Sequence, residues 1–121
     1  MIETSPERDR PALQLNLLVL RCQALEVSRR FYERLGFRFV KEQHGDGPIH
    51  YASQEAGMVF ELYPLLEGDV ADHTRLGFSV PNLEEIVPHI ETMTRHSILG
   101  EVVHIARDPD GRKVELIERT T

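Results

Sequence analysis

The sequence predicts an α+β domain made of two similar modules, each with one strand, one helix and three further strands. Three observations support this prediction. A strand followed by an amphipathic helix occurs at the start of residues 13–64 and again at the start of residues 74–118. Short apolar segments bounded by glycine or proline follow each helix, as expected of strands joined by turns. The stretch 108–118 has the pattern of a turn followed by a closing strand.

The first module, residues 13–64, opens with an expected strand at residues 13–21. Both faces of this strand are largely apolar, which predicts burial on both sides. A helix is expected at residues 24–35, because apolar side chains recur along one stripe and Gly36 follows where a helix end favours left-handed backbone. The remaining strands are expected at residues 37–43, 49–53 and 57–63.

The second module, residues 74–118, repeats this order after a connector at residues 65–73, which is rich in acids and contains glycine. Its first strand is expected at residues 74–80. The segment that would form its second strand is short, around residues 97–99, so this strand is expected to be shortened or lost. The second module is therefore predicted to be a shortened copy of the first.

The helix of the second module has a clear start signal, but a proline interrupts the pattern that follows. Asn82, followed by Glu85 three residues later, resembles a capping box that opens a helix. Pro88 falls within the apolar stripe that continues from there. Because proline removes a hydrogen bond inside a helix, the helix either kinks at Pro88 or begins later than Asn82.

The closing hairpin rests on the turn sequence Asp-Pro-Asp-Gly. Pro109 presets its backbone angle φ, the side chain of Asp108 can accept hydrogen bonds from nearby backbone N–H groups, and Gly111 tolerates positive φ. The arms on either side are rich in β-branched residues, which favour strands. They are expected at residues 102–107 and 113–118.

Length and charge limit the classes of function. The 121 residues fit one compact domain. A formal net charge of −6 and a pI near 5.5 argue against nucleic acid or an anionic membrane as partner, since both need a basic surface. No apolar run approaches the length that spans a bilayer.

The ends of the chain and its cysteine content predict the compartment. Residues 1–12 are polar, without the apolar core of a signal peptide, and are expected to form a mobile arm; residues 119–121 form a short tail. Cys22 is the single cysteine, so no internal disulfide is available. This usage fits a reducing compartment, and we expect a cytoplasmic protein in which Cys22 packs rather than reacts.

Several short motifs together carry a resemblance to a known superfamily. They are Leu17-Leu-Val-Leu-Arg-Cys22, Arg30-Phe-Tyr-Glu-Arg-Leu-Gly-Phe37, Phe60-Glu-Leu62, Leu76-Gly-Phe-Ser-Val80, Asp108-Pro-Asp-Gly111 and Val114-Glu-Leu-Ile-Glu118. Their order and spacing over residues 13–118 resemble the vicinal oxygen chelate superfamily of glyoxalase I, extradiol dioxygenases, fosfomycin-resistance enzymes and bleomycin-binding proteins. The resemblance implies two modules curled into one mixed sheet, a cup with the site on its concave face, and a homodimer.

The same resemblance provides a test for a metal centre. Metalloenzymes of this superfamily hold a divalent ion with His and Glu ligands, one on the first and one on the last strand of each module. Glu61 and Glu115 match the Glu positions, whereas Leu17 and Arg75 stand at the His positions. Leucine has no donor atom for a metal, and a guanidinium only donates hydrogen bonds. No cofactor is therefore predicted, with a divalent metal kept as the alternative.

Arg75 could supply the positive charge that a metal would otherwise bring. If Glu61 and Glu115 converge in the cup, their repulsion requires a cation, and the planar fork of Arg75 can bind two carboxylates. Such a trio could be structural. It could also turn an N–H face of Arg75 toward an oxygen-rich ligand.

Three further residues are candidates for the site. Arg21 is in register with the cup face of the first strand and is a candidate for ligand binding, or else a solvated charge. His50 and Tyr51 lie on opposite faces of one strand, so one of them lines the cup, and Tyr51 would offer a ring and a hydroxyl to a ligand. His104 joins Glu61 as a candidate for proton transfer, or else is a histidine satisfied within the sheet.

Two classes of function follow from these residues. The first is a small-molecule binding protein that holds an organic ligand on the concave face, without the usual metal centre and without turnover. The second is a metal-dependent lyase, isomerase or dioxygenase in which Glu61 and Glu115 act as ligands or bases. The missing His ligands favour the first class and the two glutamates keep the second open, since one fold can carry many activities.

Overall fold

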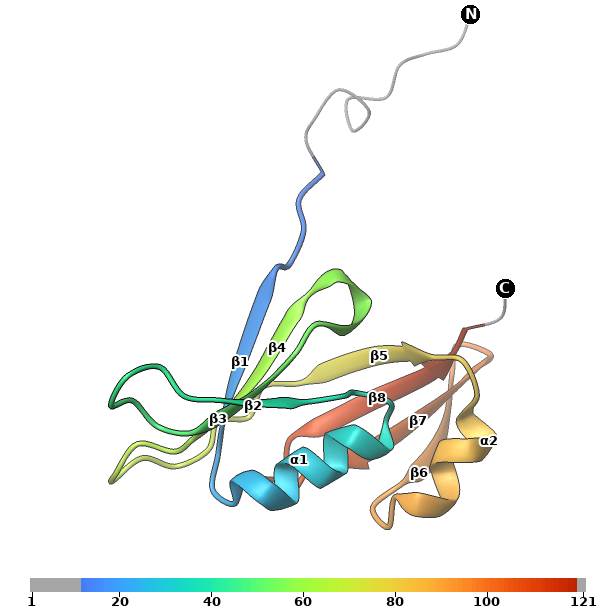
Figure 1. Cartoon of the computed structure of the whole chain (residues 1–121). Helices are drawn as coiled ribbons and strands as arrows, with labels where there is room; N and C mark the ends of the chain where they lie inside the picture. The colour runs from blue at the N-terminus through green and yellow to red at the C-terminus, as the bar shows by residue number, and fades with distance from the viewer. Residues whose placement is uncertain (1–11, 120–121) are drawn as a thin grey trace, which may run out of the picture.

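The structure is a computed structural model that describes residues 12–119. The arm predicted over residues 1–12 and the tail predicted over residues 119–121 lie outside this range, except for Ala12 and Arg119. Figure 1 shows two groups of strands, with both helices on the same side of them. Within the described range, no helix has the length and apolar character needed to cross a membrane.

The first module forms a four-stranded sheet in the order β1-β4-β3-β2. Its elements are β1 (Leu17–Cys22), α1 (Leu25–Arg34), β2 (Val40–Glu42), β3 (His50–Ser53), the short 3₁₀ helix η1 (Glu55–Gly57) and β4 (Val59–Pro64). Strand β1 pairs in parallel with β4, while the other two pairings are antiparallel. The sheet is therefore mixed, as predicted.

The second module repeats this topology in the order β5-β8-β7-β6, again with one parallel pairing, between β5 and β8. Its elements are β5 (Leu76–Val80), α2 (Leu83–Ile86), the 3₁₀ helix η2 (Val87–His89), β6 (Thr94–Ile98), β7 (Glu101–Arg107) and β8 (Lys113–Glu118). The predicted α+β fold of two βαβββ modules is confirmed.

Local signals account for the ends of the helices. Gly36, just after α1, has a φ of 120°, which an L side chain rarely adopts. At α2, the side chain of Asn82 accepts a hydrogen bond from the backbone N–H of Glu84 over 3.1 Å, so the predicted cap is present. Pro88 sets the length of this helix, because the α-helical turns end at Ile86 and a 3₁₀ turn carries the chain through the proline.

The second module is shortened in its helix and not in its second strand. Helix α2 has 4 residues against 10 in α1. Strand β6 has 5 residues, against 3 in β2, and pairs along its whole length with β7, so the expectation that this strand is shortened or lost is wrong. The polar sequence of Thr94–Ser97 lacks the apolar alternation of a half-buried strand, but β7 provides hydrogen-bond partners for its backbone.

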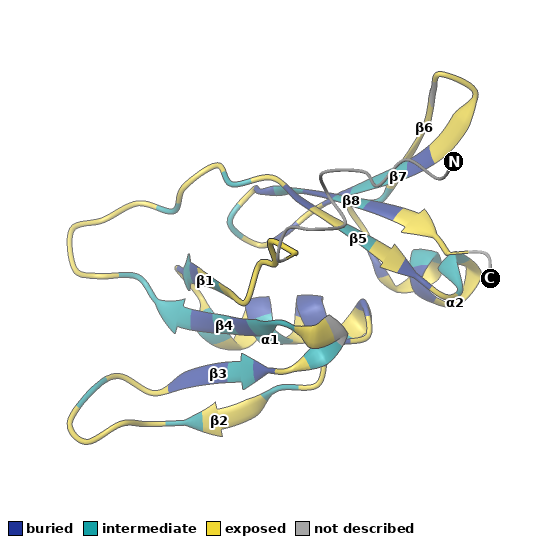
Figure 2. Cartoon of the chain, turned by 90° about the horizontal axis from the view of Figure 1, so that it is seen from above, coloured by how far each residue is buried: buried dark blue, intermediate teal, exposed yellow. Residues whose placement is uncertain are grey.

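The core lies between the sheets and the helices. Figure 2 shows buried residues along β3 and β4 and on the turns of α1, whereas β2, β6 and the connecting loops are mostly exposed. Phe60 of β4 is fully buried, and its ring packs against those of Tyr32 and Phe37 at centroid distances of 5.1 and 4.9 Å. Phe78 of β5 joins the same cluster, with its ring 5.1 Å from that of Phe37. The aromatic core therefore spans both modules.

Strand β1 is buried on one face only. Leu20 and Cys22 are buried, but Leu17 and Val19 on the other face are 53% and 37% exposed. The expectation that both faces are buried is wrong for the single chain, because no layer among residues 12–119 covers the face opposite α1. Strand β1 also lies at the edge of its sheet. An exposed apolar edge of this kind bears on assembly, as argued below.

Candidate functional site

Strand register places several polar side chains on the face of the first sheet opposite α1, which we call the Glu61 face. Its residues are Leu17, Val19 and Arg21 of β1, Glu61 and Tyr63 of β4, His50 and Ala52 of β3, and Glu42 of β2. Directly paired residues point to the same face, and side chains alternate along a strand. Ala52 pairs with Glu61 and Glu42 pairs with His50, so both carboxylates share this face with the imidazole.

His50 is the buried centre of the Glu61 face, with 1% of its surface exposed. Its Nε2 lies 3.4 Å from a carboxylate oxygen of Glu42 and 3.6 Å from one of Glu61. Its ring stacks on that of Tyr63 with centroids 4.1 Å apart and planes 7° apart, and the His44 ring lies 5.1 Å away. The arrangement concentrates two carboxylates and two imidazoles in one place.

The corresponding open face of the second sheet, which we call the Glu115 face, is built around an ion pair. It consists of Arg75, Gly77 and Ser79 on or just before β5, Ile105 and Arg107 of β7, and Lys113, Glu115 and Ile117 of β8. A guanidinium nitrogen of Arg75 donates to a carboxylate oxygen of Glu115 over 2.6 Å. The Arg75 side chain is 60% exposed, so the pair lies at the surface and leaves donors free to meet a ligand.

Two small grooves flank this ion pair, each with a volume of about 180 Å³. One is lined by Gly77, Phe78, Ser79, Glu115 and Ile117. The other is lined by His73, Arg75, Arg107, Gly111, Arg112 and Lys113, which makes it strongly basic in a chain of net charge −6. A basic groove beside a partly free guanidinium favours anionic groups.

The predicted trio of two glutamates and one arginine does not form. Arg75 pairs with Glu115, while Glu61 lies next to His50 in the other module. Among residues 12–119, no ion pair within 4.0 Å joins Arg75 to Glu61. Each glutamate therefore has a local partner of its own.

Two of the predicted site residues lie on the opposite, helix-facing side of their sheets. Tyr51 pairs with Leu62 on the buried face and donates a hydrogen bond from its hydroxyl to Glu26 of α1. This bond raises the pKa of Tyr51 and lowers that of Glu26. His104 pairs with Leu116, whereas its neighbour Ile105 faces Glu115. His50, and not Tyr51, therefore lies on the Glu61 face. His104 lies on neither the Glu61 face nor the Glu115 face.

Arg21 is on the Glu61 face, as predicted from its register. Its guanidinium donates to the backbone carbonyl of Pro64 over 3.2 Å and lies 4.8 Å from the ring centroid of Tyr63. The same ring stacks on His50. Arg21 is therefore held against β4, where it packs on the Tyr63 ring that stacks on His50.

Cys22 has the environment of a packing residue. It is buried at the end of β1, and burial is the main cause that raises the pKa of its thiol to about 11. The reactive form of cysteine is the thiolate, which is scarce at neutral pH when the pKa is this high. The sequence-based expectation that Cys22 packs is consistent with this environment.

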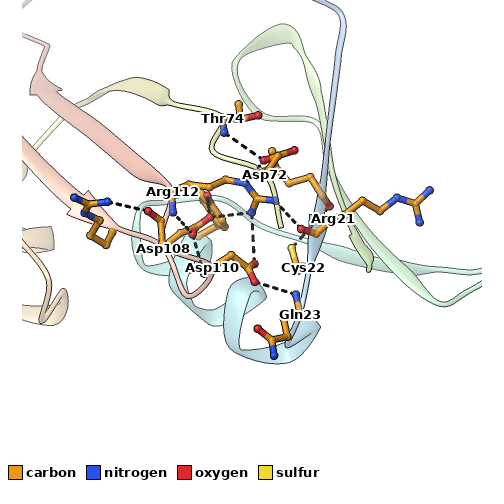
Figure 3. Close-up of polar contacts among 12 residues, drawn as sticks. Arg21, Cys22, Gln23, Asp72, Thr74, Asp108, Asp110 and Arg112 are labelled. Carbon is orange, nitrogen blue, oxygen red and sulfur yellow. Dashed lines mark hydrogen bonds and ion pairs between the residues drawn. The ribbon is translucent and has the colours of Figure 1, made fainter. Parts of the chain in front are cut away.

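A polar junction between the modules is the largest feature that sequence reasoning missed. Figure 3 shows Arg112, which follows the Asp-Pro-Asp-Gly turn, surrounded by three aspartates. Arg112 is 1% exposed and donates to Asp72, to Asp108 and to the backbone carbonyl of Arg21 over 2.7, 3.2 and 2.6 Å. The turn was predicted, but nothing local indicates that the arginine after it points inward.

The junction also includes the first helix. The Tyr32 hydroxyl donates to Asp108 over 2.7 Å, and the backbone N–H of Gln23 donates to Asp110 over 3.1 Å. Burial, followed by the nearby Asp108 charge, raises the pKa of Tyr32, so its hydroxyl stays protonated as a donor. The turn at the end of the second module is therefore bonded to β1 and α1 of the first.

The charged forms of Arg112 and Asp72 favour the folded state at neutral pH. Burial alone would lower the pKa of Arg112, but hydrogen bonds to Asp72 and Asp108 raise it above its usual value. The hydrogen bond from Arg112 is the main cause that lowers the pKa of Asp72 below its usual value of 3.8. The stabilisation from Asp72 is therefore present above about pH 4 and is lost as the pH falls through the lowered pKa.

A larger cavity of about 480 Å³ lies on the helix side and shares only Ser79 with the Glu115 face. It is bounded by the end of α1, by β5 and by α2, and its lining includes Phe37, Phe78, Glu55 and Glu85. It contains none of the predicted site residues. It lies where the modules meet, since Phe37 of the first module and Phe78 of the second both line it.

Sequence comparison identifies the superfamily of the chain. Residues 14–116 match the Glyoxalase/Bleomycin resistance protein/Dioxygenase superfamily. The chain belongs to this superfamily. A search among curated proteins finds no significant match.

Several solved structures share the fold of this chain. The chain is similar to the oxidase ChaP-H1, with 17% identity, a TM-score of 0.70 and coverage of 90% of this chain and 98% of that one. It is also similar to the oxidase ChaP-H2, with 16% identity, a TM-score of 0.68 and coverage of 91% and 96%. A lactoylglutathione lyase from Agrobacterium tumefaciens has 17% identity, a TM-score of 0.63 and coverage of 90% and 96%. These likenesses establish the fold.

The residues present do not fit the metal centre that the glyoxalase superfamily implies. Leu17, at the first His position, has no donor atom and is half exposed on the Glu61 face. Arg75, at the second, places a cation 2.6 Å from the carboxylate of Glu115 that would bind the metal. The superfamily's two-module set of ligands is therefore replaced by a leucine and a surface ion pair.

Proposed function

We propose that the protein binds a small organic molecule bearing a carboxylate or another anionic oxygen group on the concave face of the sheet, without the superfamily's usual metal centre. The observation that carries this proposal is the Arg75–Glu115 pair. Glu115 accepts a hydrogen bond from one guanidinium nitrogen of Arg75 over 2.6 Å, and Arg75 also lines the basic groove. A guanidinium fork held in place by one carboxylate is well placed to bind a second one from a ligand.

The charges around Arg75 support an anionic ligand. Arg107 and Lys113 form a directly paired position on β7 and β8, and both line the same groove. The adjoining groove adds Ser79 as a hydroxyl partner and Ile117 as an apolar wall. A ligand with an anionic head and a small apolar body matches this succession of groups.

A binding titration tests the role of Arg75. Isotope-labelled protein is titrated with benzoate and citrate, and with benzamide as the neutral counterpart, while amide signals are followed by NMR. We expect the carboxylates to shift the signals of Gly77 and Ser79 and benzamide to leave them unchanged. Arg75→Gln should weaken carboxylate binding about 10- to 100-fold, because a hydrogen bond to a charged group contributes about 1.5–3 kcal/mol.

The matched control is Arg95→Gln, which removes an exposed arginine from β6 outside both grooves. It lowers the net positive charge of the second module by the same amount. If Arg95→Gln weakens binding as much as Arg75→Gln, general electrostatics explain the affinity and the proposed role of Arg75 is wrong. Carboxylates that shift signals only in the first module would also contradict it.

A second copy of the chain is proposed to complete the concave face. Each groove of about 180 Å³ is smaller than the roughly 300 Å³ at which small-molecule pockets begin. Leu15, Leu17 and Val19 leave a row of exposed apolar side chains along one sheet edge. Covering this row with an identical chain would bury it and would enclose the ligand between the two copies.

Sedimentation measures this assembly directly. We expect a dimer at micromolar concentrations and a shift of Leu17→Asp to monomer, because a charge in an apolar interface loses its hydration without gaining a partner. Val70→Asp is the control, since Val70 is 87% exposed on the connector between the modules. A wild-type chain that sediments as a monomer at 100 μM, or a Leu17→Asp variant that stays dimeric, would contradict the proposed interface.

A metal-dependent lyase, isomerase or dioxygenase is the second candidate function. It is favoured by one observation, the 3.6 Å approach of a Glu61 oxygen to the Nε2 of His50, which gives one of the two glutamates a nitrogen donor beside it. Glu115 has no such neighbour, as it is bound to Arg75. For either function, the single buried Cys22 fits a reducing compartment, and a cytoplasmic location stays our prediction.

A further inference from the structure

We infer that Glu42, His44 and His50, with Glu61 beside them, form a binding site for one divalent transition-metal ion that lies wholly within the first module. The donor atoms of Glu42, His44 and His50 all lie within 4.8 Å of one another. The site is separate from the Arg75–Glu115 pair, so this inference does not depend on the proposed ligand function. It is also displaced from the two-module metal centre, with which it shares only Glu61.

The spacing of the donor atoms fits a shared ion better than direct contacts. The Nε2 of His50 lies 3.4 Å from Glu42 and 3.6 Å from Glu61, and it has no hydrogen-bond partner although it is buried. Two ligand atoms that each lie about 2.1 Å from an ion at the tetrahedral angle are about 3.4 Å apart. A buried nitrogen left without a partner between two carboxylates is unfavourable unless something else binds it.

The tautomer of His50 suits a metal ligand. Its Nδ1 lies 3.2 Å from the backbone carbonyl of Pro48, which can only accept, so Nδ1 carries the proton. A neutral ring then presents the lone pair of Nε2 to the two carboxylates. Metal-binding histidines commonly donate their other ring N–H to a carbonyl in this way, which fixes the orientation of the ring.

The surrounding structure fixes His50 and leaves the other donors room to adjust. Stacking on Tyr63 holds the imidazole, and Arg21 lies over that tyrosine in turn. Glu42 is opposite His50 in the β2–β3 pairing, while His44 follows in the exposed loop. A donor set of two imidazoles and two carboxylates suits Zn²⁺, Mn²⁺, Fe²⁺ or Co²⁺ and is a poor match for Mg²⁺ or Ca²⁺, which prefer oxygen ligands.

The test is a titration of the tag-free full chain with Zn²⁺ by calorimetry and with Co²⁺ by visible absorption. We expect one ion per chain, a Kd in the micromolar range or tighter, and the absorption bands of four- or five-coordinate Co²⁺. Saturating Zn²⁺ should raise the melting temperature by roughly 5 °C or more, since a ligand that binds only the folded state stabilises it.

Variants assign the ligands and separate this site from other sites. Glu42 is half-buried and His44 is exposed, so both can be replaced without unfolding the chain. Glu42→Gln and His44→Gln should each weaken Zn²⁺ binding at least about 10-fold. His50→Gln should abolish binding but alters a buried residue, so its fold is checked by circular dichroism. His89→Gln, on the exposed surface of η2, and Glu115→Gln should leave the affinity unchanged.

Each alternative outcome overturns the inference. No binding at pH 7.5 would mean that Glu42, His44 and His50 do not form a metal site. Binding that Glu115→Gln abolishes would place the ion between the two modules. Binding that survives both Glu42→Gln and His44→Gln would be adventitious.

Discussion

Replacement of Arg112 by methionine should lower the free energy of unfolding by about 3–5 kcal/mol, because removing one partner of a buried ion pair leaves the other charge uncompensated. Asp108 and Asp110 would remain as nearly fully buried carboxylates next to an apolar side chain. Small domains are stable by only about 5–15 kcal/mol, so the loss would be a large part of the total. Urea unfolding followed by circular dichroism measures the change.

Arg107→Met is the matched control for this variant. Arg107 lies in the same hairpin but is exposed, with one guanidinium hydrogen bond to the carbonyl of Gly111. Its replacement should change the stability by less than about 0.5 kcal/mol. Adding Asp108→Asn to Arg112→Met should recover part of the loss, since it removes one of the two buried charges. Equal effects of Arg112→Met and Arg107→Met would show that the junction does not hold the modules together.

Replacement of Phe60 by alanine should cost a similar amount, about 3–5 kcal/mol, for a different physical reason. Phe60 is fully buried and its ring packs against aromatic rings from α1, from the segment just before β2 and from β5. Alanine would leave a cavity in the cluster that joins the two modules. Thermal unfolding by calorimetry, under the same conditions for each variant, provides the measurement.

Phe39→Ala is the comparison for the aromatic core. Phe39 belongs to the same cluster, with its ring 5.9 Å from that of Phe60, but it is only partly buried. Its loss should cost clearly less than the loss of Phe60, because less apolar surface returns to water. A Phe39→Ala variant as unstable as Phe60→Ala would mean that burial does not govern the stability of this cluster.

The sequence was sufficient for the parts of the fold that local chemistry decides. The Asp-Pro-Asp-Gly turn forms as predicted, with Gly111 at a φ of 90° and its N–H bonded to the carbonyl of Asp108 over 2.9 Å. Asn82 caps the second helix and Pro88 limits it, because a cap and a missing N–H act within one or two turns. The order of strands followed from two repeats of the same pattern.

The candidate site was harder to predict because it depends on register between strands and on loop conformation. His50 and Tyr51 were known to face opposite ways, but only the β3–β4 register decides which of them joins Glu61. The approach of His44 depends on the path of the loop that begins there. No local pattern distinguishes a buried Arg112 from the exposed Arg107 five residues earlier, since the difference arises from contacts with the other module.

The polar junction also bears on the order of events during synthesis. The bonds from Gln23 to Asp110 and from Arg112 to Arg21 join residues 87 and 91 positions apart in the chain. Tyr32 is fully buried in the first helix, and the partner of its hydroxyl is Asp108. A nascent chain that has emerged from the ribosome only as far as the connector would therefore hold a first module with unsatisfied polar groups. We expect this half to become fully ordered only after the last turn has been released, so that the two halves fold together.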